Sequence, residues 1–74
     1  MKILATRLKE LREDRRIYQR EMAELLGLSM RGYQGYETDQ SEPKLATVVA
    51  IADYFDVSID YLVGRTDVPA MRKK

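Results

Sequence analysis

The chain is predicted to fold as a compact all-α domain of five short helices, and three observations on its 74 residues support this. Apolar residues recur at helical spacing in several short segments. Turn-prone residues separate these segments, and no segment has the alternating pattern of a useful strand. The length allows one domain with one small core, and neither an internal repeat nor a linker divides it.

The first two helices are expected at about residues 3–15 and 19–26. Both carry an apolar stripe at helical spacing. The stripe consists of Leu4, Leu8 and Leu11 in the first helix, and of Met22, Leu25 and Leu26 in the second. We therefore expect each of these helices to turn one face toward the core.

A third helix is expected at about residues 30–37, directly after a turn. Ala23 lies four residues before Gly27 on the inward face of the second helix, where a small side chain lets two helices cross closely. Gly27 can adopt the left-handed conformation that ends a helix, and Ser29 can cap the next one. This order is that of a helix-turn-helix, which presents its second helix to the DNA major groove.

The next segment is expected to form a loop and a fourth helix. Residues 38–43 are polar and turn-prone, and Pro43 fits the first position of the helix. The helix has the clearest apolar pattern in the chain, formed by Leu45, Val48, Val49, Ile51, Ala52 and Phe55. Asp56 and Val57 are expected to end it.

The last expected helix is short. Ser58 is a good cap for it, the apolar residues Ile59, Leu62 and Val63 form its stripe, and Gly64 ends it. We expect residues 1–66 to form the domain. Residues 67–74 form a short basic tail, and the chain is expected to be frayed from Thr66 onward.

The composition narrows the class of protein. The chain has no cysteine and no histidine, which removes disulfides, thiolate metal sites and the usual catalytic base and nucleophile. No apolar run approaches the roughly 20 residues needed to span a bilayer, and the start of the chain becomes polar too soon for a signal peptide. We expect a cytoplasmic protein that is not an enzyme and has no metal, no cofactor and no membrane partner.

The charge distribution favours a nucleic-acid partner, although only weakly, because the net charge is only +1. Residues 1–20 hold seven Lys or Arg and three acidic residues, whereas residues 21–42 hold five acidic residues and one base, Arg31. A lone arginine at the front of the third helix fits one base-reading residue with separate phosphate contacts. The alternative is that these bases mostly form the solvated faces of surface helices.

With these residues in view, the chain resembles the phage-repressor and Cro-type helix-turn-helix family, also called the xenobiotic-response-element (XRE) type. The likeness covers about residues 4–64. The resemblance rests on Gln19, Ala23, Gly27, Ser29, the pair Tyr36 and Glu37, Pro43, and the final segment at residues 55–64. The resemblance implies sequence-specific, usually dimeric, binding of operator DNA for transcriptional control.

The chain departs from the family pattern in three places. Tyr18 stands where relatives often have Ser, Thr or Asn, so a side-chain cap of about 1 kcal/mol is missing. Arg16 stands where relatives often have Gly, so a left-handed conformation there would be mildly strained. The third helix contains Gly32 and Gly35, each costing roughly 1 kcal/mol. They either let the backbone approach a base closely or are tolerated surface positions.

Several residues of the third helix are candidates for contact with DNA bases: Met30, Arg31, Gly32, Gln34 and Gly35. Arg31 can bond guanine O6 and N7 with two hydrogen bonds, although a phosphate contact is the alternative. Gln34 could bond adenine in the same way, and Met30 could touch a thymine methyl group. By resemblance Tyr33 and Tyr36 belong to the core, with stacking on nucleic acid as the alternative.

Candidates for contact with DNA phosphates flank this helix in the sequence: Gln19, Ser29, Thr38, Gln40 and Lys44. Gln19 stands at the start of the second helix, where the helix dipole and free amides favour an anion. By resemblance its side chain contacts a backbone phosphate and braces the recognition helix. The alternative is that it only caps its own helix.

The resemblance also implies two structural roles. Arg12 and Glu37 occupy positions where relatives have an ion pair between the first helix and the recognition helix. Relatives form dimers around the fourth and fifth helices, so Val57, Ile59 and Tyr61 are candidate interface residues, or else belong to the core.

The expected function is that of a transcriptional regulator, most simply a repressor that binds a palindromic operator as a homodimer. An alternative is an antitoxin-like subunit that binds a partner toxin and uses DNA binding for autoregulation. Another is an interaction-only bundle, for which Gly32 and Gly35 would be the signs. A protein partner, such as a toxin or an antirepressor, is not identified by the sequence.

Overall fold

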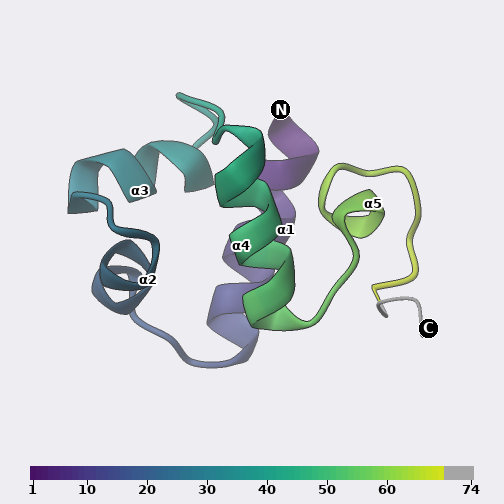
Figure 1. The fold of residues 1–74 in the computed structure, drawn as a ribbon, viewed down its shortest axis with the longest axis horizontal. Helices are drawn as coiled ribbons and strands as arrows, with labels where there is room; N and C mark the ends of the chain where they lie inside the picture. The colour runs from purple at the N-terminus through teal and green to yellow at the C-terminus, as the bar shows by residue number, and fades with distance from the viewer. Residues whose placement is uncertain (70–74) are drawn as a thin grey trace.

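The computed structural model describes residues 1–69, which form five helices and no β-strand (Figure 1). The helices are α1 (Lys2–Asp14), α2 (Gln19–Leu26), α3 (Met30–Glu37), α4 (Leu45–Phe55) and α5 (Ile59–Leu62). The predicted all-α fold with a helix-turn-helix at α2 and α3 is confirmed.

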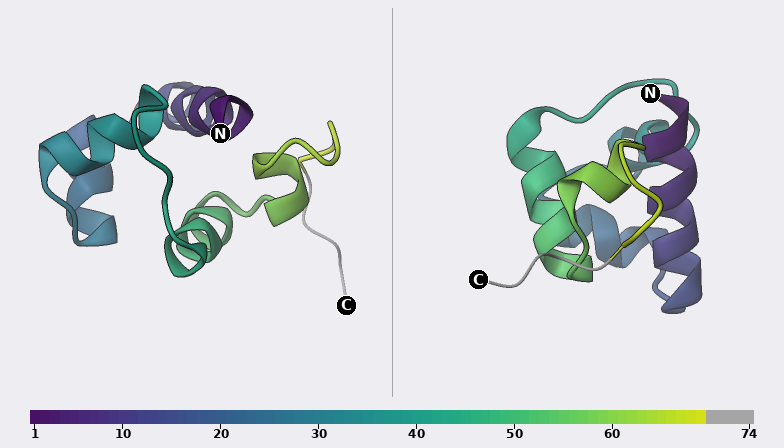
Figure 2. Two further views of the ribbon diagram at one scale, coloured as in Figure 1. Left: turned by 90° about the horizontal axis from the view of Figure 1, so that it is seen from above. Right: turned by 90° about the vertical axis from the view of Figure 1, so that its right-hand side faces the viewer.

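The helices enclose one small core. α1 and α4 overlap in Figure 1 but lie on opposite sides of the molecule in Figure 2, with α2 and α3 closing one end and α5 the other. Six side chains at the centre are fully buried: Leu8, Met22, Tyr33, Ile51, Phe55 and Leu62. They come from all five helices, so the core holds α3 to the rest of the domain.

The turn between α2 and α3 has the expected geometry. Gly27 adopts the left-handed conformation at φ 70°, and its amide donates to backbone carbonyls of α2. Ser29 is extended, and its hydroxyl accepts a hydrogen bond from the Gly32 amide at 3.0 Å. These two residues therefore end one helix and begin the next, which sets the angle between them.

The turn before α2 shows two of the departures from the family pattern. Arg16 is left-handed at φ 57°, the conformation expected to strain a residue other than glycine. Tyr18 makes no side-chain cap hydrogen bond. Its amide instead donates to the Glu21 carboxylate at 2.9 Å, which satisfies an amide at the start of the helix by another route.

The predicted position of Pro43 is wrong. Lys44 is extended and its carbonyl accepts from the amides of Thr47 and Val48, so Lys44 is the N-cap and α4 begins at Leu45. Pro43 lies two residues before the first helical residue. The loop continues further than expected because the first helical hydrogen bonds start from the Lys44 carbonyl.

The expectation of a frayed chain from Thr66 onward is wrong for residues 66–69. Arg7 of α1 donates to the carbonyls of Tyr61 and Thr66 and to the Asp67 carboxylate, and its guanidinium lies 4.1 Å from the centre of the Tyr61 ring. These contacts come from a residue far away in sequence, so the local polarity of the segment did not predict them. The basic end of the tail lies outside the described residues.

No helix within residues 1–69 is long enough and apolar enough to cross a membrane.

Candidate nucleic-acid interface

α3 has two distinct faces. Tyr33 and Glu37, four residues apart, are buried against the domain, and Tyr36 between them is half-buried. Met30, Arg31 and Gln34 are exposed on the opposite side. This follows from the helical repeat of 3.6 residues, and it leaves an intact helix with three long side chains pointing away from the core.

The buried face of α3 is fixed to α1 by an ion pair. Arg12 Nε donates a hydrogen bond to Glu37 Oε2 at 2.5 Å, and Arg12 Nη2 donates one to Glu37 Oε1 at 3.1 Å. The Glu37 side chain is only 2% exposed. It also accepts hydrogen bonds from the Tyr33 hydroxyl and from Gln19 Nε2. Arg12, Tyr33 and Gln19 thus supply the donors that a buried carboxylate needs.

The pKa of Glu37 reflects two opposing effects. Burial acts to raise the pKa of this carboxyl, but the hydrogen bonds from Arg12, Tyr33 and Gln19 outweigh it and lower the pKa below its usual value. Burial and the neighbouring carboxylate together raise the pKa of the Tyr33 hydroxyl, so Tyr33 remains a donor. Glu37 is therefore a carboxylate at neutral pH, and it can only accept hydrogen bonds.

A pH dependence of stability follows from the lowered pKa of Glu37. The stabilisation is fully present above the usual carboxyl pKa, about 4.3, and is lost as the pH falls through the lower folded value. We expect the free energy of unfolding in urea to fall with decreasing pH below this point. Glu37→Gln, which cannot titrate, should show a shallower fall. The same slope in both proteins would contradict the assignment.

Gln19 connects the ion pair to the outer face of α3. Its Nε2 donates to Glu37 Oε1 at 3.0 Å, and its Oε1 accepts from Gln34 Nε2 at 3.1 Å. Gln19 therefore touches both faces of α3 from the start of α2. The family resemblance implied that Gln19 braces the recognition helix, but not that it would bond to Gln34.

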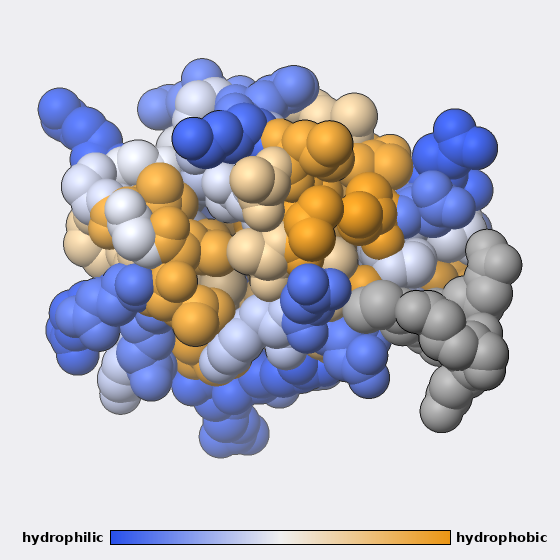
Figure 3. Space-filling model, viewed as in Figure 1, coloured by the Kyte–Doolittle hydropathy of each residue, from blue (hydrophilic) through white to orange (hydrophobic). Residues whose placement is uncertain are grey.

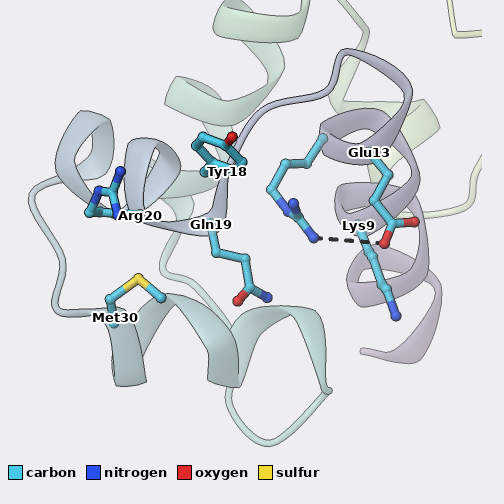
Figure 4. Close-up of a pocket in the computed structure, with 7 residues that line it drawn as sticks. Lys9, Glu13, Tyr18, Gln19, Arg20 and Met30 are labelled. Atoms are coloured by element: carbon cyan, nitrogen blue, oxygen red, sulfur yellow. Dashed lines mark ion pairs between the residues drawn. The ribbon is translucent and has the colours of Figure 1, made fainter.

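A hollow of about 770 Å³ opens beside the exposed face of α3, where α1, α2 and α3 meet. Its lining residues are Lys9, Arg12, Glu13, Tyr18, Gln19, Arg20 and Met30 (Figure 4). Lys9, Tyr18 and Arg20 were not among the candidate residues from the sequence. The excess of bases in residues 1–20 was the signal for Lys9 and Arg20, but it could not tell which bases face α3, and it gave no signal for Tyr18.

The other phosphate candidates lie at the start of α3 and between its end and α4. Ser29 caps its start, and the Thr38 hydroxyl at its end donates to the Gln34 carbonyl at 3.0 Å. Gln40 is exposed, and its backbone amide donates to the Gly35 carbonyl at 2.9 Å. Lys44 is exposed at the N-cap of α4. Both hydroxyls are thus engaged with the backbone, whereas the side chains of Gln40 and Lys44 extend into solvent.

The two glycines of α3 have neighbours in the chain itself. A Cβ at Gly35 would lie 2.9 Å from the Ser41 hydroxyl, and one at Gly32 would lie 3.2 Å from the Ser29 hydroxyl. The amides of Gln40 and Ser41 also donate to the Gly35 carbonyl. The loop after α3 therefore packs so close to the helix that it leaves little room for a side chain at position 35. Neither sequence-based alternative included this explanation for the glycine.

Of the candidate dimer residues, Val57 belongs to the core, since only 4% of it is exposed. Its assignment to an interface is therefore wrong: the turn after α4 directs it inward. Tyr61 is half-buried beneath the Arg7 guanidinium. Ile59 remains exposed.

The comparison with known families agrees with this geometry. The sequence model of a family described as helix-turn-helix matches residues 8–62, which is most of the chain and includes the whole α2–α3 unit. The chain belongs to the XRE-type helix-turn-helix family of transcriptional regulators. The matched region begins within α1 and ends with α5, so the helices that surround α3 are part of the family domain.

Several relatives in this helix-turn-helix family have curated names. The uncharacterized HTH-type transcriptional regulator YobD of Bacillus subtilis is 38% identical over 63 residues, which are 85% of this chain and 56% of YobD. ImmR of the same species, an HTH-type transcriptional regulator, is 35% identical, covering 88% of this chain and 51% of ImmR. RstR, a cryptic phage CTXphi transcriptional repressor from Vibrio cholerae, is 40% identical over 64% of this chain and 42% of RstR.

A solved structure of another transcriptional regulator has the same fold. The crystal structure of a transcriptional regulator from Listeria innocua superposes with a TM-score of 0.81 at 28% identity, covering 96% of this chain and 64% of that chain. The chain spans about half the length of the curated helix-turn-helix relatives it matches.

Proposed function

We propose that this protein is a sequence-specific DNA-binding transcriptional regulator, a repressor that binds a palindromic operator as a homodimer with α3 in the major groove. The observation that carries the proposal is the division of α3 into two faces. Tyr33 and Glu37 anchor it to the domain, while Met30, Arg31 and Gln34 extend into solvent from an intact helix. A helix anchored in this way can enter a groove without unfolding.

The exposed face of α3 carries the proposed base contacts. The Arg31 side chain makes no hydrogen bond or ion pair with residues 1–69, so its donors are available for guanine O6 and N7. Gln34 can accept from an exocyclic amine, and Met30, beside it on the same face, can contact a thymine methyl group. Gly32 and Gly35 follow on the far side of Arg31, where the absence of a side chain would let the α3 backbone approach a base pair.

The hollow beside α3 supports phosphate binding. Lys9, Arg20 and Gln19 line it with polar groups, and Lys9 and Arg20 are exposed. A DNA strand that passes along α3 would bring its phosphates toward this hollow at one end, and toward Gln40 and Lys44 at the other. Such contacts position the protein on DNA without reading sequence. Ser29 and Thr38 lie between these groups.

The surface over α4 and α5 supports a homodimer. Leu45 is 71% exposed, and Val49, one turn later, and Ile59 of α5 are also exposed. Figure 3 shows apolar side chains gathered over α4. One domain of this kind contacts only about 600–1,000 Å² of DNA. Two copies joined here would place two copies of α3 on successive half-sites, about 34 Å apart.

The test of DNA recognition is selection of bound duplexes from a random pool at a stated salt concentration. The full chain is expected to enrich one motif with two inverted halves whose centres lie about ten base pairs apart. Affinity for the selected duplex should fall as salt rises, because phosphate contacts release counterions. Recovery of unrelated sequences without a shared motif would contradict the proposal.

The test of the dimer is sedimentation with and without the palindromic duplex. Two copies of the chain are expected on one duplex, and Val49→Lys should reduce this to one copy because it places a charge in the apolar surface. Leu25→Lys is the control, because Leu25 is also an exposed apolar residue, at 51% against 37% for Val49, but lies on α2 and outside this surface. Loss of the second copy in both variants would contradict the assignment of this surface.

A further inference from the structure

A chain of hydrogen bonds leads from the buried ion pair to the outer face of α3. Arg12 and Tyr33 hold the Glu37 carboxylate inside the domain. Gln19 Nε2 donates to that carboxylate at 3.0 Å, and Gln34 Nε2 donates to Gln19 Oε1 at 3.1 Å. Figure 4 shows the Gln19 side chain extending from the start of α2 toward α3. The buried carboxylate is thus two hydrogen bonds away from Gln34.

The direction of these hydrogen bonds, from donor to acceptor, is fixed at the buried Glu37. A carboxylate only accepts hydrogen bonds, so Gln19 must turn its NH₂ group toward Glu37. The Gln19 carbonyl oxygen then faces Gln34, and only the NH₂ group of Gln34 can bond to it. An exposed glutamine normally rotates its amide freely between two orientations. For Gln34 one of them would bring two carbonyl oxygens together, which leaves Oε1 and one N–H directed to solvent.

We propose that Glu37 and Gln19 determine specificity at the base pair that Gln34 reads, although neither is assigned a base contact. They hold Gln34 with Oε1 outward, so that it favours a base with an exocyclic amine in the major groove, adenine or cytosine, over guanine or thymine. The remaining N–H fits the N7 acceptor of adenine, which makes adenine the preferred partner. This inference rests on the proposed function, and it adds the direction of the hydrogen bonds to it.

The role of Gln19 as a phosphate contact is compatible with this arrangement. The Gln19 NH₂ group has two hydrogens, of which one bonds to Glu37 and the other is available. Removal of the Gln19 amide therefore has two separable effects. Loss of a phosphate contact weakens binding to all sequences alike, whereas loss of the constraint on Gln34 changes the preference among bases.

The test compares wild type with Gln19→Met, which keeps the length of the side chain and removes its polarity. Glu37 Oε1 still accepts from Arg12 Nη2 in this variant, so the fold should be retained. Binding is measured by fluorescence anisotropy on four duplexes that differ at one base pair, the one whose preference disappears in Gln34→Ala. Wild type should prefer adenine by roughly 5- to 150-fold. Gln19→Met should reduce this preference to within about threefold.

The matched control is Gln40→Met, which removes an exposed glutamine amide that has no contact with Gln34. As a proposed phosphate contact, Gln40 should contribute equally on all four duplexes, so this variant should weaken binding to them alike and leave the preference among them unchanged. A loss of affinity in Gln19→Met that is equal on all four duplexes would overturn the inference and leave Gln19 as a phosphate contact only.

A second measurement needs no DNA. Relaxation of the side-chain ¹⁵N amide groups in the free protein should show Gln34 Nε2 to be ordered in wild type, and as mobile as Gln40 Nε2 in Gln19→Met. Equal mobility of Gln34 in both proteins would overturn the inference whatever the DNA results. If Gln34 is ordered but Gln34→Ala loses no preference at any base pair, Gln34 reads no base and this role in specificity fails. The proposed function fails separately, if selection from the random pool recovers no shared motif.

Discussion

Glu37→Ala is expected to lower the free energy of unfolding by about 3–5 kcal/mol, because it leaves the Arg12 guanidinium charged and partly buried without its partner. Arg12 is only 12% exposed, and two of its nitrogens bond to Glu37. The variant also removes the acceptor of the buried Tyr33 hydroxyl and of Gln19. Urea unfolding followed by circular dichroism at neutral pH measures the change.

The matched control uses the other acidic partner of the same arginine. Glu13 lies 3.9 Å from Arg12 and is exposed, so Glu13→Ala should change the free energy of unfolding by less than about 1 kcal/mol. If Glu37→Ala does not fold, the double variant Arg12→Met/Glu37→Leu should recover much of the loss, because it strands no charge. An unfolding curve of Glu37→Ala that matches wild type would show that the pair does not hold α3.

Arg31→Ala is expected to cost about 1–3 kcal/mol of binding free energy on the preferred operator and to relax the preference at one base pair. The reason is that Arg31 stands exposed on α3 with its donors unused by residues 1–69, which suits two hydrogen bonds to guanine. Fluorescence anisotropy on the selected duplex and its single-base variants measures both effects.

Lys9→Ala is the control for this experiment, because it removes the same charge from the hollow beside α3. It should weaken binding to all duplexes alike and reduce the slope of affinity against salt by about 1. If Arg31→Ala behaves in the same way, Arg31 contacts a phosphate and not a base.

Local signals predicted most of the fold. The bounds of α2 and α3 agree with those expected, because Gly27 and Ser29 act within the segment and the apolar spacing continues on both sides. The start of α4 was placed too early, because Pro43 permits a helix to begin but does not require it. The extended Lys44 decides the start, and its conformation depends on the path of the whole loop.

The candidate interface was predicted only in part. The family resemblance placed Tyr33 in the core, and Arg31 was then expected on the opposite face of α3. The resemblance cannot show that Gln19 bonds to Gln34, or that Ser41 fills the space beside Gly35, because these contacts join separate elements. The contacts of Arg7 with residues 61–67 were missed for the same reason.

The separation of α3 into a buried face and an exposed face also affects how such a protein can change during evolution. Met30 and Arg31 contribute nothing to the buried centre, whereas Tyr33 and Glu37 hold the helix in place. Under the proposed function, a lineage could therefore exchange the two outward residues, and thereby acquire a new target sequence, without passing through poorly folded intermediates. Gln34 is less free to vary, since a replacement there must still suit the carbonyl oxygen that Gln19 presents.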